Sequence, residues 1–406
     1  MTIAHAIGRA WLSTGGPEGL STGSQNYDEF ADESEITAII AANPMSALGV
    51  EMPHCAPDSL GQTLEASLPA AVERLAAAKE AGRYVPYDDV AVVYAITAPD
   101  GTTGFGLWCM VETAEISTAA DEPGHVIRNE DVFIEKVRER VALAEHIGHL
   151  LSPVLLLATD QAQALHDALA ATAEEFGTPV VSDVDQAGRR HELWPVLTAE
   201  RRDELLALAS AGELVVADGN HRSLAAQMAK LPSFLAVITT PMSVAIQPYN
   251  RLVATAPAVA ELIERLEAAG AQITPVRATE GPPSVRGTVH LYAGPDASFA
   301  VRLPSTPGAP DVDNLDHALV ERIILGDVLG LGAGDKAITY VGGDYPADWL
   351  RGEVDAGRAG LAILIPPVTV DDFVAVNLAR GKVPRKSTWF TPKARAGLVV
   401  AELDAR

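Results

Sequence analysis

Cysteine and aromatic residues are scarce in this sequence. Of its 406 residues only 2 are cysteines, Cys55 and Cys109, and aromatic side chains make up 5%. Two cysteines exclude a disulfide framework and cannot form a zinc site by themselves, so they indicate a reducing compartment. We therefore predict a cytoplasmic protein in which both cysteines are buried core residues.

Basic residues are few relative to acidic ones. The chain has 30 Lys and Arg residues against 54 Asp and Glu residues, which gives a formal net charge of -24. A surface this acidic repels nucleic acid and anionic membranes, so neither is expected as a partner. A nucleotide remains compatible with this charge, because its phosphates need only a local basic pocket.

Long apolar runs, internal repeats and low-complexity tracts are missing. No stretch of about 18 apolar residues occurs, so no transmembrane helix is expected. Residues 1–20 lack the basic start and apolar centre of a signal peptide. Hydrophobic residues are nevertheless abundant at 48%. A chain of this length and composition is expected to form two or three subdomains, each with its own core.

Alternating strand and helix patterns predict an α/β (α+β) fold with a mixed sheet core. Apolar runs at 90–97 and 103–111 flank the turn Pro99-Asp100-Gly101 and predict a β-hairpin, which favours a mixed sheet over an all-parallel one. Helical periodicity is strong at 62–82 and is also present at 133–151. The apolar face of the first of these helices is predicted to consist of Leu64, Leu68, Val72 and Leu75.

Composition shifts divide the chain into four expected segments. Residues 1–25 form an N-terminal segment, and residues 26–256 form the core domain. Residues 257–313 contain Pro- and Gly-rich stretches and are predicted to be an insertion-like, smaller α/β subdomain. Residues 314–406 form a C-terminal segment that is expected to complete the functional site.

The densest group of chemically active side chains is Asp218-Gly219-Asn220-His221-Arg222-Ser223. It follows an apolar strand at 214–217 and precedes a helical stretch, and such a turn directs backbone N–H groups toward an anion. Arg222 matches phosphate oxygens, and Asp218 can hold magnesium or accept a proton. The structural alternative is that Asp218 and Ser223 only cap the turn and the helix, with Arg222 solvated.

A second charged group lies near the C-terminus, in the stretch 384–393. It contains three cations, Arg385, Lys386 and Lys393, and forms a positive island in an acidic chain. Phosphate binding is the functional interpretation, and a solvated basic loop is the structural one. Arg251 also has two interpretations: it contacts a phosphate, or it is a buried structural arginine.

These motifs carry a family resemblance. The pattern Asp-Gly-X-His-Arg at 218–222 resembles the ParB/sulfiredoxin-like superfamily, which includes a free serine kinase and in which this turn binds nucleotide phosphates. From about Asn26 to about Leu403 the chain resembles the bacterial family called domain of unknown function 1015 (DUF1015). Its motif Ala-Asp-Gly-His-His-Arg-Tyr corresponds to 217–223. Further matching stretches are Asn43-Pro44-Met45-Ser46, Arg128-Asn129-Glu130, Pro248-Tyr249-Asn250-Arg251 and the whole of 384–393.

The resemblance implies a ParB/sulfiredoxin-like nucleotide-binding turn and a small-molecule kinase. Such an enzyme would phosphorylate a hydroxylated molecule, for example a free amino acid such as serine, with Mg²⁺ and ATP or ADP, and with CTP as a further candidate nucleotide. The implied catalytic residues are Glu130, Asp218 and His221. The implied magnesium ligands are Asp218 and Glu130. The implied nucleotide-binding residues are Gly219, Asn220, Arg222, Ser223, Arg251, Lys386, Ser387, Thr388 and Lys393.

Three other interpretations stay open at this stage. A ParB-like switch that binds CTP or ATP without small-molecule chemistry would use the same turn. A phosphoester hydrolase would use the same phosphate contacts with water as the nucleophile. The third interpretation is a change of substrate or a loss of activity. It is based on the asparagines at 129, 220 and 250, where the family usually has histidine. The charge cluster around Glu130 also has a structural explanation, because acidic residues at a helix start complement the helix dipole.

Overall fold

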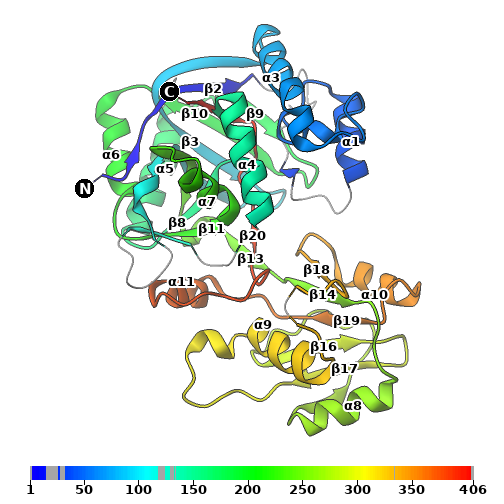
Figure 1. Cartoon of the computed structure of the whole chain (residues 1–406). Helices are drawn as coiled ribbons and strands as arrows, with labels where there is room; N and C mark the ends of the chain where they lie inside the picture. Colours follow the sequence, from blue (N-terminus) through cyan, green and yellow to red (C-terminus); the bar gives the residue numbers. More distant parts are fainter. Residues whose placement is uncertain are drawn as a thin grey trace. The chain divides into compact units, whose positions relative to one another are not determined.

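Two large sheets organise the chain, and a third sheet has two strands (Figure 1). The computed structural model describes residues 2–14, 26–27, 33–117, 124–128, 132, 134–332 and 334–403. One unit consists of Met1–Val244 with Pro392–Arg406, and the other consists of Ala245–Thr391. The chain therefore divides at 244/245 and 391/392, whereas the sequence suggested divisions after 25, 256 and 313.

The first unit is built on a mixed sheet with the order β5-β6-β11-β8-β12-β4-β3-β2-β21-β7. The pairs β5/β6, β6/β11 and β8/β12 are parallel, and the other neighbours are antiparallel. The predicted mixed α/β fold is thus confirmed. Its strands, with β1 pairing β4 and β10 pairing β3 and β9, are β1 (Ala4–His5), β2 (Ile7–Ser13), β3 (Tyr84–Thr97), β4 (Thr103–Glu112), β5 (Ile116–Ser117), β6 (Val126–Ile127), β7 (His149–Leu150), β8 (Val154–Ala158), β9 (Val181–Val184), β10 (Arg190–Val196), β11 (Leu214–Asp218), β12 (Ser233–Thr239) and β21 (Val399–Glu402).

The predicted hairpin is present as β3 and β4. Their antiparallel register places Val92 opposite Trp108. The turn between them closes because Gly101 adopts a φ of 89° and the Thr102 N–H donates to Asp100 Oδ1 at 2.9 Å. Strand β3 begins six residues earlier than the apolar run at 90–97 suggested, because residues 84–90 pair with β2.

Helices of the first unit follow their predicted positions with two corrections. In α3 the buried stripe runs through Ser67 and Ala71, so Val72 lies at the edge of that stripe and is exposed. Helix α4 ends at Ile147 because Gly148 has a left-handed φ of 64°, and His149 therefore lies in β7 and not on the helix. The helical segments are α1 (Glu33–Ala42), α2 (Leu48–Glu51), η3 (Pro53–Cys55), α3 (Leu64–Glu80), η4 (Thr113–Glu115), α4 (Ile134–Ile147), α5 (Ala162–Phe176), α6 (Ala199–Ala209), α7 (Asn220–Met228) and η5 (Pro241–Ser243).

The second unit has a six-stranded sheet among the residues described, in the order β15-β17-β16-β19-β14-β18. Residues 257–313 supply three of these strands, and β16 pairs directly with β19, so this stretch is an integral part of the sheet. Strands β13 and β20 pair separately. The elements are β13 (Ala245–Gln247), β14 (Asn250–Val253), α8 (Val259–Ala268), β15 (Gln272–Pro275), β16 (Thr288–Tyr292), β17 (Ser298–Arg302), η6 (Asp311–Asn314), α9 (Asp316–Leu319), a π-helix at Val320–Val328, β18 (Ile338–Val341), α10 (Ala347–Asp355), β19 (Leu361–Leu364), α11 (Val370–Leu378) and β20 (Trp389–Thr391).

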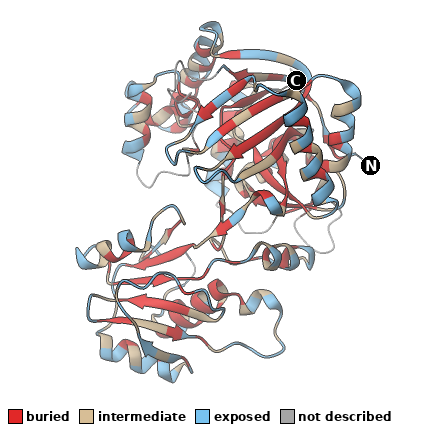
Figure 2. Cartoon of the chain, turned by 180° about the vertical axis from the view of Figure 1, so that it is seen from behind, coloured by how far each residue is buried: buried red, intermediate tan, exposed pale blue. Residues whose placement is uncertain are grey.

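Each sheet supplies most of its unit's core. In β19, Leu361 and Ile363 pack toward α8 and the π-helix, while Ala362 and Leu364 pack toward α10, as the two-residue period of a strand requires. Figure 2 shows the same division, with buried residues concentrated in the strands and exposed residues on the outer helical faces. Within the described ranges, none of the helices combines the length and apolar character that crossing a bilayer requires.

Candidate functional site

The strand-to-helix turn begins where β11 ends, at Asp218. Gly219 lies between the strand and α7 and has a left-handed φ of 99°. A Cβ atom at this position would lie 3.0 Å from Arg222 Nε and 3.2 Å from Val154 Cα, so glycine alone fits without displacing a neighbour. Helix α7 starts directly afterwards at Asn220, which confirms the predicted order of strand, turn and helix.

The side chains of this turn differ in burial. Asn220 and Ser223 are buried, and Ser223 Oγ donates to the Asn220 carbonyl oxygen at 3.0 Å. The Ser223 hydroxyl therefore stabilises the first turn of α7. His221 is half-buried. Asp218 and Arg222 form an ion pair through Oδ2 and Nη2, with side chains that are 28% and 12% exposed.

The Asp218–Arg222 ion pair determines what the turn can do chemically. An arginine fork can bind a phosphate group through two N–H donors, and a carboxylate can coordinate Mg²⁺. The positive end of the α7 dipole lies at the same place and favours an anion. The strand is also bulged here, since its register against β8 shifts between Val216 and Asp218, and bulges commonly redirect side chains near functional sites.

Strand β6 brings Arg128, the first residue of a second motif, to the edge of the sheet where the turn lies. It pairs in parallel with β11, and Ile127 lies opposite Val215. Parallel neighbours end at the same edge of a sheet, so Arg128 follows β6 on the side where β11 ends at Asp218. The Arg128 N–H donates to the Ser117 carbonyl oxygen at 3.3 Å. Residues 129–131, which include the predicted catalytic residue Glu130, lie outside the described residues.

A buried carboxylate near the turn was missed by the sequence analysis. Glu51, the last residue of α2, accepts a hydrogen bond from Ser152 Oγ at 2.7 Å and lies 3.5 Å from Arg140 Nη1. The Arg140 guanidinium also stacks over the Tyr27 ring at 4.3 Å. One cavity of about 50 Å³, which is room for a few water molecules, is lined by Glu51, Arg140, Ser152 and Arg222, among others. The only sequence signal for Glu51 is its position shortly after the Asn43-Pro44 motif.

In the second unit, Arg251 is fully buried in β14. Its Nε and Nη2 donate to Glu321 Oε1 at 3.1 and 3.0 Å, and its other bonds go to backbone carbonyl oxygens. Burial lowers the pKa of this guanidinium, and the charge of Glu321 opposes that effect. The bonds to carbonyl oxygens, through Nη1 and Nη2, reach Tyr249, Asn250, Arg385 and Lys386. Arg251 thus holds the 384–391 loop against β14.

The basic loop itself is ordered by short-range contacts. Ser387 is fully buried and its Oγ donates to the Pro384 carbonyl oxygen at 2.6 Å. Lys386 adopts a left-handed φ of 57°, and its Nζ lies 5.7 Å from the Tyr249 ring centroid. Thr388 is half-buried. Lys393 is buried and belongs to the first unit, because the division falls between Thr391 and Pro392.

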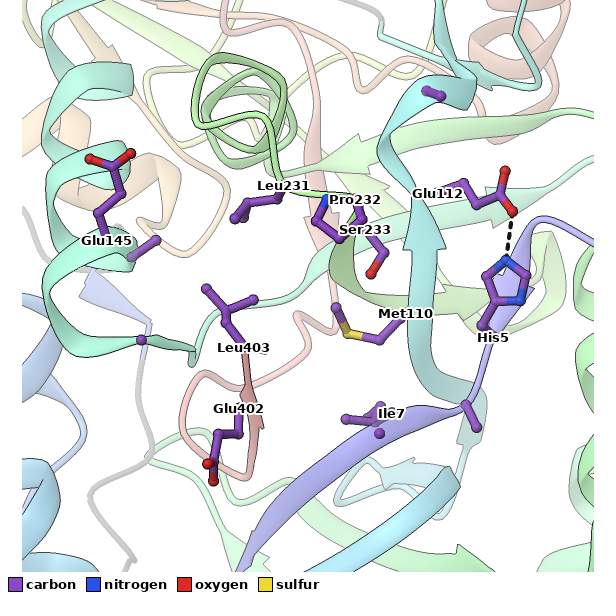
Figure 3. A pocket seen from close by; sticks show the side chains of 15 residues that line it. His5, Ile7, Met110, Glu112, Glu145, Leu231, Pro232, Ser233, Glu402 and Leu403 are labelled. Atoms are coloured by element: carbon purple, nitrogen blue, oxygen red, sulfur yellow. Dashed lines mark hydrogen bonds and ion pairs between the residues drawn. The ribbon is translucent and has the colours of Figure 1, made fainter. Parts of the chain in front are cut away.

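A larger cavity of about 1070 Å³ lies elsewhere in the first unit, and no residue of the turn lines it. Figure 3 shows His5 and Glu112 paired on one side, with His5 Nε2 2.8 Å from Glu112 Oε1, and Glu145 and Glu402 on the other side. Its volume lies just above the range of about 300–1,000 Å³ that is typical of small-molecule sites. The apolar part of its lining is formed by Ile7, Met110, Leu231 and Leu403, among others.

The family model described as a protein of unknown function (DUF1015) matches residues 22–318. No curated protein matches the chain.

Solved structures with a similar arrangement share little sequence with this chain. A free serine kinase in complex with AMP has 13% identity and a TM-score of 0.40, covering 72% of this chain and 92% of that one. A conserved hypothetical protein from Pyrococcus furiosus has 15% identity and a TM-score of 0.38, covering 72% and 95%. SbnI from Staphylococcus aureus, truncated at its C-terminus, has 12% identity and a TM-score of 0.38, covering 72% and 87%.

Proposed function

The chain belongs to the DUF1015 family, and we propose that it is a nucleotide-dependent kinase that phosphorylates a small hydroxylated molecule. The observation that carries this proposal is the turn between β11 and α7, where Asp218 and Arg222 form an ion pair beside the left-handed Gly219. A helix N-terminus, an arginine fork and a carboxylate are the groups that phosphoryl transfer needs for charge neutralisation and positioning.

The proposed roles within the turn follow from its ion pair. Arg222 would bind a phosphate group of the nucleotide, and the Asp218 carboxylate would coordinate Mg²⁺. The ion pair between Asp218 and Arg222 would therefore break only when both nucleotide and Mg²⁺ are bound. Gly219 lets the backbone approach the phosphates, and Asn220 and Ser223 keep the first turn of α7 in place. The assignment of residues 218–222 as a ParB/sulfiredoxin-like nucleotide-binding turn is part of this proposal.

The proposed reaction is a direct transfer. The substrate hydroxyl oxygen attacks the terminal phosphorus of ATP, the bond from that phosphorus to the ADP oxygen breaks, and the hydroxyl proton passes to a base. Glu130 is the proposed base and second magnesium ligand, since it follows β6 in the chain, the strand next to β11. His221 is the alternative base within the turn. A free amino acid such as serine is the first acceptor to test.

The part of the basic loop that lies in the second unit, 384–391, is proposed as a second phosphate-binding element. Lys386 and Thr388 are its proposed ligands, which supply an ammonium group and a hydroxyl. Lys393 belongs to the first unit and is proposed separately as a nucleotide-binding residue there. Arg251 and Ser387 act on the loop itself, because their donors already bind its carbonyl oxygens. This assignment predicts that Lys386→Ala weakens nucleotide binding without changing the stability of the second unit.

The first experiment is a thermal-shift screen with ATP, ADP, CTP and GTP, each with Mg²⁺. A nucleotide at about 100 times its Kd stabilises the folded state by about 2.7 kcal/mol. We expect this stabilisation to disappear in Asp218→Asn and Arg222→Ala. Arg265→Ala is the matched control, since it breaks another acid–arginine pair four residues apart, with Glu261 on α8.

The second step separates transfer from hydrolysis. With the stabilising nucleotide, ADP release that depends on an added acceptor indicates a kinase, and release of phosphate without an acceptor indicates a hydrolase. Binding without either product would favour a nucleotide-dependent switch. If no nucleotide stabilises the wild-type chain, the proposal is wrong.

A further inference from the structure

One group of metal-ligating side chains lies apart from the turn, between α1 and η3. His54 and Cys55 are consecutive in η3, and Glu33 is the first residue of α1. One ligand atom from each of these three side chains lies within 4.8 Å of the others. The three donors are a thiol sulfur, an imidazole nitrogen and a carboxylate oxygen. We name this group the α1–η3 cluster.

The backbone beneath the α1–η3 cluster is fixed by contacts between the two elements. Thr37 Oγ1, one turn along α1 from Glu33, donates to the Cys55 carbonyl oxygen at 2.7 Å. Ile36 and Ile40 of α1 also pack with Cys55 in a small apolar core. The three donors therefore lie on two elements, α1 and η3, whose backbone and side chains contact each other.

The His54 imidazole has a buried nitrogen that the rest of the described chain does not satisfy. Its Nδ1 atom is inaccessible to solvent and has no hydrogen-bond partner among the described residues. A buried polar atom without a partner costs about 1–3 kcal/mol. His191 is a useful contrast, since both of its ring nitrogens have partners, Tyr94 and Asp185. A cation bound to His54 Nδ1 would remove that cost.

Cys55 differs from the other cysteine in its surroundings. Its sulfur lies within 4.8 Å of ligand atoms of Glu33 and His54. Cys109 is also buried, but its neighbours are the apolar side chains of the central sheet. Among the described residues, Cys55 is therefore the cysteine that lies beside other metal-ligating groups.

We propose that Glu33, His54 and Cys55 bind a zinc ion. Thiolate, imidazole and carboxylate are all zinc ligands, whereas magnesium and calcium select oxygen donors. Three protein ligands leave the fourth tetrahedral position for water or for an exogenous ligand. The ion would also join the start of α1 to η3. This proposal does not depend on the proposed kinase activity, because its residues and its test involve no nucleotide.

The test uses the full chain, stripped of metal with a chelator, and cobalt as a spectroscopic substitute for zinc. We expect one equivalent of Co²⁺ to bind with a thiolate-to-cobalt charge-transfer band and a tetrahedral ligand-field spectrum, and excess Zn²⁺ to abolish both. Cys55→Ser should remove the charge-transfer band. Cys109→Ser is the matched control, since it alters the other buried cysteine, and its band should equal that of the wild type.

Two further variants keep the test decisive if Cys55→Ser fails to fold by circular dichroism. His54→Gln and Glu33→Gln should each weaken Co²⁺ binding at least tenfold and shift the ligand-field bands. The proposal is overturned if the wild type shows no charge-transfer band. It is equally overturned if folded Cys55→Ser keeps the band, if Cys109→Ser loses it, or if His54→Gln and Glu33→Gln bind Co²⁺ as the wild type does.

Discussion

At the scale of single residues, Gly219 lies in close contact with Arg222, one member of the ion pair with Asp218. The left-handed φ of 99° is unfavourable for any residue with a Cβ, and that atom would also press against Arg222 and the backbone of Val154. A substitution at Gly219 therefore strains the turn and displaces the arginine that we propose as the phosphate ligand.

We expect Gly219→Ala to lower the free energy of unfolding of the first unit by about 1–3 kcal/mol and to abolish nucleotide stabilisation. Urea denaturation and the thermal-shift screen measure the two effects. Gly101→Ala is the control, because Gly101 also has a positive φ, 89°, but a Cβ there would meet no atom within 4 Å. Equal losses in the two variants would show that the contacts with Arg222 and Val154 are unimportant.

Asp316 gives the second unit a pH dependence of its own. Its carboxylate is buried at the start of α9 and its Oδ1 accepts the Gly287 N–H at 2.6 Å. Burial is the main cause that raises its pKa from 3.8 to about 6. Between these two values the folded state binds more protons than the unfolded state, so this residue lowers stability as the pH rises from about 4 to about 6.

Asp316→Asn should remove this contribution, since an amide oxygen can still accept the Gly287 N–H. We measure the free energy of unfolding of the variant and of the wild type by urea denaturation at pH 4.5 and at pH 7.5. The difference, variant minus wild type, should be larger at pH 7.5 than at pH 4.5. Asp313→Asn, an exposed change in η6, serves as the control. A stability difference between Asp316→Asn and the wild type that is the same at both pH values would contradict the prediction.

At the scale of elements, Arg251 connects β14, the π-helix and the 384–391 loop. Its side chain is fully buried, donates twice to Glu321 of the π-helix, and lies 4.4 Å from the Tyr340 ring centroid in β18. Removing one member of a buried ion pair leaves the other charge without compensation, which is far more costly than breaking a pair at the surface. The loop would lose its anchor at the same time.

Arg251→Ala should therefore destabilise the second unit by about 3–5 kcal/mol. Arg286→Ala breaks an ion pair with Asp372 in which both side chains are largely exposed, and it should cost no more than about 1 kcal/mol. Chemical denaturation followed by tryptophan fluorescence compares the two. Similar losses for both variants would mean that Arg251 does not hold the loop in solution.

Elements with a strong local signal were predictable, and those that depend on distant partners were not. The hairpin β3–β4 and the turn before α7 follow from turn residues and from apolar runs. Strand β10 was missed, because Pro195 and its charged residues hide a strand whose pairing with β3 spans about a hundred residues of chain. Glu51 was missed for the same reason, since its partner Arg140 lies 89 residues away.

At the scale of the whole molecule, the two units differ in how the chain builds them. The second unit is one continuous stretch with its own sheet and core. The first unit requires the last residues, because β21 lies between β2 and β7 in its sheet. Removing one strand from inside a sheet exposes two rows of unpaired backbone groups.

We expect a fragment of residues 245–391 to fold cooperatively by itself and a chain truncated after 391 to retain a folded second unit but lose the first. Circular dichroism and two-dimensional NMR of the two fragments distinguish these states. The full chain should unfold in two calorimetric transitions, and one of them should match the isolated fragment. An unfolded 245–391 fragment would be the contrary result.

The position of β21 has a consequence for the time course of biosynthesis. At about 5–20 residues per second, roughly 20–80 seconds separate the synthesis of β2 from that of β21. During this interval the free side of β2 has no partner, while the later-made second unit can already be complete. Strand β2 therefore lacks one of its two neighbours until β21 has been made, and a chaperone that covers strand edges would act on β2.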